Sequence, residues 1–176
     1  MVTRCRTLLL VGVLCALGAL AHGSDPVVFP KLTADNLQKA TMHLPDDFKG
    51  KKNLLIVTFE REQQKEADTW LPAVKQLQQD KPEFSYYELP VLPRRDILYR
   101  WWLNSAMRSA MPDQMSWTHT IPLYTDKESF REKLQIPTEQ TISLLLVDKG
   151  GSVIWRTTGP MNDDKKKALM DALGAQ

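Results

Sequence analysis

The chain has 176 residues, enough for one domain of ordinary size with its own hydrophobic core. Its composition, 43% hydrophobic and 25% charged, is that of a globular protein and excludes a largely disordered chain. The formal net charge of +2 is too small for nucleic-acid binding through bulk charge.

The first 21 residues have the composition of a secretory signal peptide. Arg4 and Arg6 precede an uncharged apolar run, Thr7 to Ala21, which ends in small residues suited to cleavage. Cleavage is expected near Ala21 or Gly23, which predicts a secreted or periplasmic protein. An apolar run of about 15 residues is short for a membrane span. Membrane contact is therefore expected only if this segment stays uncleaved as an anchor.

Both cysteines of the chain, Cys5 and Cys15, lie within the predicted signal peptide. Cleavage would leave a mature chain with no cysteine and hence no disulfide. It would also remove two of the 23 basic side chains, so that 21 remain against 21 acidic ones. A neutral mature chain is expected to bind no nucleic acid, and its core must stabilise it unaided.

The N-terminal half predicts strands that alternate with helices. Residues 22–43 are expected to form an extension, with a short edge strand over Ala40–Leu44. Leu54–Phe59 is a continuous apolar run, typical of a strand buried on both faces. After a polar turn, a helix is predicted from apolar residues three and four apart: Ala67, Trp70, Leu71 and Val74. The aromatic-rich run Phe84–Val91 predicts the next strand, so this order indicates a parallel crossover.

Residues Pro93–Met111 predict an amphipathic helix that packs its apolar face on the core. On a helical wheel, one face carries the apolar residues Leu98, Tyr99, Trp102, Leu103, Ala106 and Ala110. The opposite face carries Arg100, Asn104 and Arg108. Trp101 lies beside the polar face, where it either binds a partner or covers the edge of the core beneath an arginine stem.

The last third of the chain predicts a polar loop, a short helix, a β-hairpin and a final helix. The loop covers Asp113–Thr120, and a turn with glycines covers Asp148–Gly151, where positive φ is needed. The remaining elements are expected over Thr125–Leu134 (helix), Thr141–Val147 and Ser152–Thr158 (antiparallel strands) and Asp163–Leu173 (helix).

This order of elements resembles the thioredoxin-like superfamily in its peroxiredoxin-like arrangement. The resemblance implies an α/β domain over residues 44–176, with a central mixed β-sheet flanked by helices. An N-terminal β extension and an insertion before the last β-hairpin complete the expected fold. Phe59 and Pro72 are spaced like the aromatic residue and the proline that bracket the superfamily's redox motif.

That spacing places Gln64 and Ala67 at the two cysteine positions of the superfamily, and Ile142 at the position of its cis-proline. Neither Gln64 nor Ala67 can form a disulfide or attack a peroxide. The resemblance therefore implies a domain without thiol oxidoreductase or peroxidase activity.

A second resemblance concerns residues 124–159. Their motifs YTDKESFREKLQIP and VDKGGSVIWRTTG are similar to those of a thioredoxin-like assembly factor of mitochondrial ATP synthase. We expect an exported, non-catalytic domain that binds a protein or peptide, as an envelope chaperone or assembly factor. The resemblance implies a binding groove at the former redox site, formed by Gln64, Ala67, Thr141, Ile142 and Ser143. A second candidate binding surface consists of Arg100, Trp101 and Arg108.

The alternative function is a thiol-independent, hydrolase-like enzyme that uses acidic residues and His119. Glu60 or Glu62, at the polar turn, would then have to meet His119 in one cleft. Acidic residues near a helix start also suit the helix dipole, and no nucleophile motif accompanies His119. No catalytic residue, metal site or cofactor is therefore assigned. A small-ligand carrier with a tryptophan-rich interior is a third possibility.

Overall fold

The computed structural model of the chain describes residues 26–111 and 113–174, and the predicted signal peptide with its cysteines lies outside them. In chain order, the helices and strands are β1 (Leu32–Asp35), β2 (Thr41–Leu44), β3 (Lys52–Thr58), the 3-10 turn η1 (Arg61–Gln63), α1 (Gln64–Asp68), α2 (Leu71–Asp80), β4 (Phe84–Leu92), α3 (Ile97–Ala110), α4 (Ser116–His119), β5 (Leu123–Tyr124), α5 (Lys127–Leu134), β6 (Ser143–Asp148), β7 (Val153–Thr158) and α6 (Asp163–Gly174).

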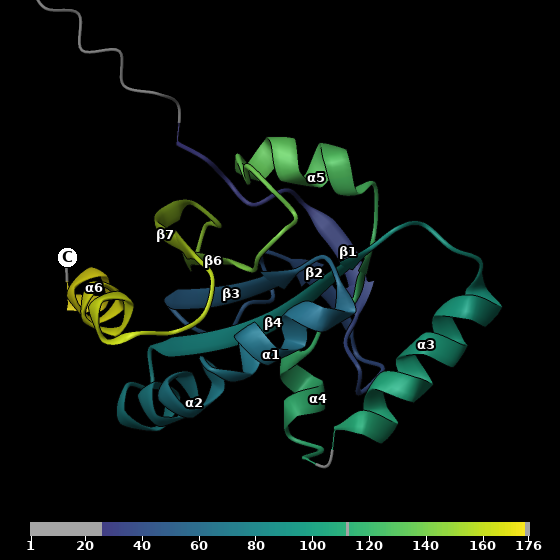
Figure 1. Ribbon diagram of the computed structural model, residues 1–176, viewed down its shortest axis with the longest axis horizontal. Coiled ribbons are helices and arrows are strands. Elements are labelled where there is room, and N and C mark those ends of the chain that lie inside the picture. Colours follow the sequence, from purple (N-terminus) through teal and green to yellow (C-terminus); the bar gives the residue numbers. More distant parts are fainter. Residues whose placement is uncertain (1–25, 112, 175–176) are drawn as a thin grey trace, which may run out of the picture.

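A mixed five-stranded sheet forms the centre of the fold, in the order β5-β4-β3-β6-β7. β3 pairs in parallel with β4 and antiparallel with β6, and β7 returns antiparallel beside β6. β1 and β2 form a separate antiparallel hairpin. This arrangement confirms the predicted α/β architecture with a mixed sheet, flanking helices and an N-terminal β extension (Figure 1).

Alternate side chains of β3 enter two different hydrophobic layers, because successive strand residues point to opposite faces. Leu54 and Ile56 pack with Trp70 and Val74, on the side covered by α1, α2 and α6. The opposite layer contains Leu55 and Val57 with residues of the β1–β2 hairpin, α5 and the segment before β1: Phe29, Met42, Leu44, Phe130 and Leu134. The N-terminal extension therefore shares the main core.

The helix predicted after β3 is interrupted. α1 ends at Asp68 and α2 begins at Leu71, with Pro72 in its first turn. Proline has no N–H to bond the carbonyl four residues earlier, but it fits the first turn of a new helix. The predicted polar loop Asp113–Thr120 likewise contains the short helix α4.

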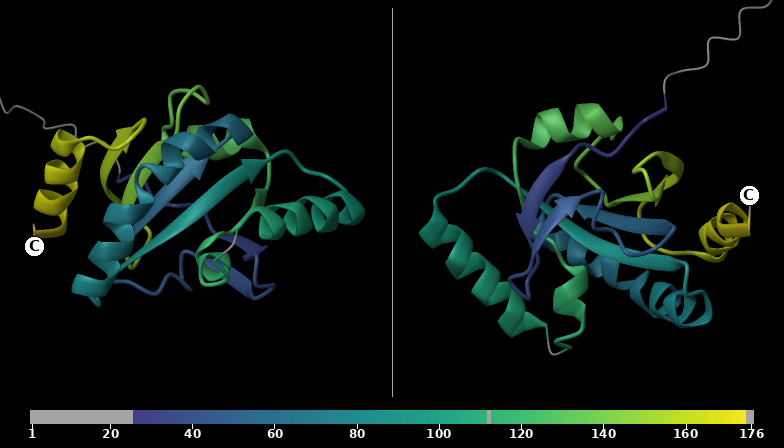
Figure 2. Two further views of the ribbon diagram at one scale, coloured as in Figure 1. Left: turned by 60° about the horizontal axis from the view of Figure 1, so that its bottom comes forward. Right: turned by 180° about the vertical axis from the view of Figure 1, so that it is seen from behind.

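α3 is present as predicted, but its orientation contradicts the predicted packing. None of its side chains is buried, and Trp102, predicted to lie in the core, is 57% exposed. Figure 2 shows α3 at the outer edge of the molecule, beyond β4. Among the described helices, none has the length and apolar composition of a membrane span.

The turn between β6 and β7 requires glycine at one of its two glycine positions. Gly151 has a φ of +86°, and its N–H donates to the Asp148 carbonyl at 3.1 Å. A Cβ at Gly151 would lie 2.7 Å from Cγ of Pro45. A Cβ at Gly150 would meet nothing nearer than the Asp148 carboxylate at 3.4 Å.

We therefore predict that Gly151→Ala lowers the free energy of unfolding by about 2 kcal/mol, because alanine is strained at positive φ and would press on Pro45. Gly150→Ala, the matched control, should change it by less than about 0.5 kcal/mol. Urea denaturation followed by circular dichroism measures both. Equal effects of the two substitutions would contradict the assigned turn geometry.

Candidate functional site

The site begins at the turn between β3 and α1, which the buried side chain of Gln63 connects to the loop before β6. Its Oε1 accepts hydrogen bonds from the backbone N–H groups of Phe59, at 2.8 Å, and Glu60, at 3.3 Å. Its Nε2 donates to the carbonyl of Glu139 at 2.5 Å. One amide thus satisfies three backbone groups and joins two segments that are far apart in the sequence.

Glu66 makes the second connection between α1 and the same loop. Its Oε2 accepts a hydrogen bond from the Thr141 hydroxyl at 2.5 Å, and the backbone N–H of Ile142 lies 3.5 Å away. Buried or charge-assisted hydrogen bonds each contribute about 1 to 3 kcal/mol. Gln63 and Glu66 therefore hold the loop against α1, while Lys127 of α5 binds the same loop through Glu139 at 2.9 Å.

The predicted groove residues lie together around this connection, but they do not all reach the surface. Gln64 is the first residue of α1, and Thr141 lies opposite Glu66; both are partly exposed. Ala67, Ile142 and Ser143 are buried, the first two completely. Ala67 and Ile142 belong to the hydrophobic layer beneath α1 and α2. A partner could touch Gln64 and Thr141 directly, whereas the other three support them from below.

Ile142, at the position of the superfamily's cis-proline, follows an ordinary trans peptide bond. Within the described residues, a cis peptide bond occurs between Leu44 and Pro45, and the bond before Ile142 is trans.

Glu88 of β4 is a buried acid beneath Gln64 that was not among the residues predicted from the sequence. Only 5% of Glu88 is exposed, and its Oε2 accepts a hydrogen bond from Nε2 of Gln64 at 3.2 Å. The same Nε2 donates to Asp68 at 2.9 Å. A single charged residue within the aromatic strand FSYYELPVL was the signal that could have indicated it.

Burial raises the pKa of the Glu88 carboxyl above its ordinary value, because the charged form loses its hydration. The hydrogen bond from Gln64 acts in the opposite direction, Asp68 raises the pKa further and Lys75 lowers it. Gln64 therefore pairs with a carboxyl that retains its proton to a higher pH than an exposed glutamate does.

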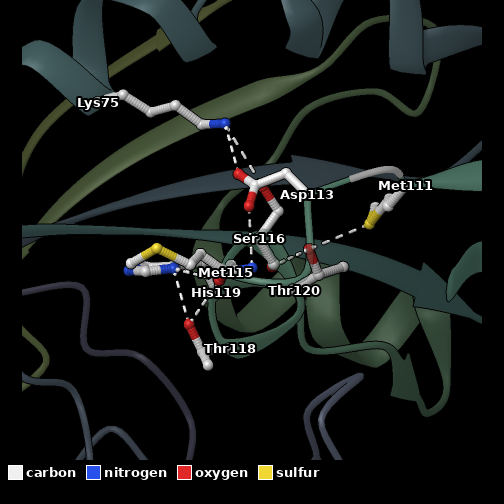
Figure 3. Close-up of polar contacts among 8 residues, drawn as sticks. All are labelled: Lys75, Met111, Asp113, Met115, Ser116, Thr118, His119 and Thr120. Carbon is white, nitrogen blue, oxygen red and sulfur yellow. Dashed lines mark hydrogen bonds and ion pairs between the residues drawn. The ribbon is translucent and has the colours of Figure 1, made fainter.

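A second polar cluster joins α2 to the segment that leads into α4 (Figure 3). Nζ of Lys75 lies 3.2 Å from Oδ2 of Asp113 and 3.4 Å from the Ser116 hydroxyl. Ser116 donates to Asp113 at 2.9 Å, and this hydrogen bond is the main cause of the lowered pKa of Asp113. The arrangement fixes the start of α4 against α2.

Both ring nitrogens of His119 are engaged in holding α4 in place. Nδ1 lies 3.2 Å from the Met115 carbonyl, so this nitrogen carries the proton, and Nε2 then accepts from the side-chain amide of Gln78 at 3.1 Å. The ring stacks on Tyr86 with centroids 4.8 Å apart. Burial lowers the pKa of His119 and favours this neutral form.

Of the two acids considered for the alternative hydrolase site, Glu60 does not meet His119. Glu60 pairs with Lys127 beyond the end of β3, whereas His119 packs on Tyr86, which lies opposite Leu54. Leu54 and Thr58, the strand positions nearest to these two side chains, lie roughly 13 Å apart along β3. The hydroxyl of Ser116 bonds to Asp113 and not to His119, so no serine–histidine pair forms there.

The second candidate surface is divided between two sides of α3. The Arg100 guanidinium stacks over the ring of Tyr124 at 4.9 Å, and Nη1 of Arg108 donates to the Leu37 carbonyl at 3.3 Å. Both arginines thus face the domain. Trp101 is 64% exposed, as its position beside the polar face allowed.

An open cavity of about 510 Å³ lies between the β1–β2 hairpin and α4. Its described lining includes Asn36, Asp47, Lys49 and His119 and contains no tryptophan. It therefore differs from the tryptophan-rich interior considered for a ligand carrier. In the part of the chain that the structure describes, no group of three or more His, Cys, Asp or Glu side chains is arranged to hold a metal ion.

The fold of the described residues is thioredoxin-like. A thiol:disulfide interchange protein from Bacteroides sp. matches with a TM-score of 0.57 and 21% identity, over 85% of this chain and 90% of that one. BsSco, of the Sco family of cytochrome c oxidase assembly proteins, matches with a TM-score of 0.58 and 15% identity, over 86% of this chain and 96% of that one. The exposed lipoprotein thioredoxin of Streptococcus pneumoniae matches with a TM-score of 0.55 and 14% identity, over 82% of this chain and 98% of that one.

The particular family follows from the sequence: the model of the ATP10 protein family matches residues 23–175, and the chain belongs to this family. The match agrees with the resemblance to the ATP synthase assembly factor. The comparison with curated proteins gives no match. At 14 to 21% identity, the structural neighbours establish the fold alone.

Glu88→Gln is predicted to stabilise the protein at neutral pH. The pKa of Glu88 is raised in the folded chain above the ordinary value of 4.5, so folding is destabilised as pH rises through the unfolded and then the folded pKa. Glutamine carries no charge and can still accept the hydrogen bond from Gln64. The gain in unfolding free energy should therefore grow as pH rises from below the ordinary pKa of 4.5 toward neutral pH.

Urea denaturation of both proteins across this pH range provides the measurement. Glu83→Gln is the matched control, because Glu83 is an exposed acid just before the same strand. The assigned role of Glu88 is wrong if its substitution leaves the pH dependence unchanged, or if Glu83→Gln alters it equally.

Proposed function

We propose that this chain is a protein-binding domain of the ATP10 family that works without thiol chemistry, as an assembly factor of the cell envelope. The observation that carries the proposal is the composition of the former redox site. Gln64 begins α1 where the resemblance expects a cysteine, and its amide is bound to Glu88 and Asp68. An amide in this position can bind a partner but cannot exchange disulfides.

The proposed binding surface, which we call the α1 rim, consists of Arg61, Gln64, Lys65, Asp68, Gln140 and Thr141. All of these are at least partly exposed and border the connection made by Gln63 and Glu66. Because that connection fixes α1 and the loop before any partner arrives, binding would lose little conformational entropy. A rigid surface with both charges and amides suits a polar segment of a protein partner.

An ATP synthase subunit is the partner class that we propose. The support is the family match over residues 23–175, together with the resemblance of residues 124–159 to the ATP synthase assembly factor. The surface groups of the α1 rim do not distinguish one subunit from another.

Export is the second component of the proposal: a signal peptide is removed near Ala21 or Gly23, and the mature domain acts outside the cytoplasm. The family match begins at residue 23, next to the predicted cleavage points, which supports a functional domain that starts there.

Site-specific photocrosslinking tests the proposed α1 rim. We expect a photoreactive phenylalanine placed at Lys65 or Gln140 to yield the same crosslinked protein, identified by mass spectrometry as an ATP synthase subunit. The same probe at Lys133 of α5 or Lys166 of α6 is the control, since these exposed positions lie on other elements. Crosslinks of equal yield from all four positions, or none from the α1 rim, would rule out the proposed surface.

Export is tested by the intact mass of the protein recovered from the periplasmic or secreted fraction. A mass that starts at His22 or Ser24, with no alkylation after reduction, is expected for a cleaved, cysteine-free chain. Recovery of a form that retains Cys5 or Cys15 would overturn cleavage and would reopen the question of thiol chemistry.

A further inference from the structure

α3 packs on the domain with its polar face. Arg100 stacks over Tyr124, and Asn104 accepts a hydrogen bond from the Tyr124 hydroxyl at 2.7 Å. One turn later, Arg108 donates to the carbonyl of Leu37. The row formed by these three residues, each four apart, is therefore the inner face of the helix, which is the reverse of ordinary amphipathic packing.

The outer face of α3, which points away from the domain, is formed by large apolar side chains of its first two turns, whereas Leu103 and Met107 further along are half-buried. Ile97 is 80% exposed and Leu98 is 76% exposed, while Trp101 and Trp102 are 64% and 57% exposed. Tyr99 is exposed as well, although its ring lies 5.8 Å from that of Trp102. Neighbouring apolar residues exposed to this extent on one element indicate a surface that is covered by a binding partner.

Positive charge is concentrated around the same helix. The segment Pro93–Met111 contains four arginines and one aspartate, a net charge of +3. Arg94 and Arg95 are exposed immediately before the helix. The other described residues carry 17 basic and 19 acidic side chains, so the rest of the domain is slightly negative. This asymmetry directs α3 toward a negatively charged surface.

We propose that the outer face of α3 binds the surface of an anionic phospholipid bilayer. Apolar side chains mixed with tryptophan and tyrosine and flanked by arginines are the composition of helices that lie in a membrane interface. The helix stands out at the edge of the molecule (Figure 2), and a lipid surface accepts such a convex face without a matching groove. A 14-residue helix is about 21 Å long, too short to cross the bilayer and suited to lie along it.

In this arrangement Leu98 and Trp102 enter the boundary between head groups and acyl chains, and Arg94 and Arg95 contact lipid phosphates. Arg100 and Arg108 keep the helix attached to the domain. The sequence predicted membrane contact only through an uncleaved N-terminal segment. The orientation of α3 provides a second contact, which is independent of that segment and of the proposed α1 rim.

Quenching of tryptophan fluorescence by brominated acyl chains tests the proposal on the full-length protein. The described residues contain five tryptophans, of which Trp70 is fully buried and Trp117 and Trp155 are partly buried. With vesicles of phosphatidylcholine and phosphatidylglycerol, we expect quenching that disappears in the variant W101F/W102F. An N-terminal anchor without tryptophan cannot produce this signal by itself.

The variant Ile97→Gln with Leu98→Gln keeps both tryptophans and should raise the lipid concentration for half-maximal quenching about tenfold or more. The matched control, Ile154→Gln with Met170→Gln, changes exposed apolar residues on β7 and α6 and should have no effect. Vesicles of phosphatidylcholine alone, or Arg94→Gln with Arg95→Gln on mixed vesicles, should give weaker quenching. The control Lys133→Gln with Lys166→Gln should leave the quenching by mixed vesicles unchanged.

Three outcomes would overturn the proposal. The first is the absence of tryptophan quenching by mixed vesicles. The second is equal quenching by neutral and anionic vesicles, which would exclude an anionic surface. The third is unchanged quenching in Ile97→Gln with Leu98→Gln, together with conversion of a dimer to a monomer in sedimentation equilibrium. That result would assign the outer face of α3 to a second copy of the chain.

Discussion

The burial of β3 on both faces is the constraint on which the rest of the structure depends. Its alternate side chains enter separate hydrophobic layers, so the strand requires cover on both sides of the sheet. α1, α2 and α6 supply one cover; the N-terminal hairpin and α5 supply the other. The end of β3 then fixes where the polypeptide turns toward α1, and with it the position of the candidate site.

At that turn, hydrogen bonds hold the loop before β6 where the superfamily places its cis-proline. Gln63 and Glu66 bind backbone and side-chain groups of this loop, and Gln64 covers Glu88. A buried carboxyl beneath the start of α1 costs free energy when it ionises, and an amide can offset only part of that cost. The site therefore combines a rigid framework with a buried titratable group beneath the start of α1.

α3 shows how tertiary packing can reverse the interpretation of an amphipathic pattern. The periodicity of the helix was correct, and the expectation that its apolar side would face the core was wrong. Tyr124 and the Leu37 carbonyl offer partners for arginine and asparagine, so the polar side is satisfied against the domain. The apolar side is then left for a surface outside the chain, and the exposed arginines beside it define the charge that this surface should carry.

The sequence by itself determined the order of the strands and most of the helices, though not α4 or the break between α1 and α2, because strand and helix periodicity and turn chemistry are local properties. The buried strands, the glycine at the β6–β7 turn and the mixed sheet followed from it, as did the family resemblance. The resemblance also predicted correctly that Gln64 and Thr141 lie in one region. Only the tertiary structure decided that Ala67, Ile142 and Ser143 are buried, that Glu88 lies beneath Gln64, and that Glu60 and His119 have separate partners. These outcomes depend on contacts between residues distant in the sequence, and periodicity identifies the two faces of a helix but not which face the domain will contact.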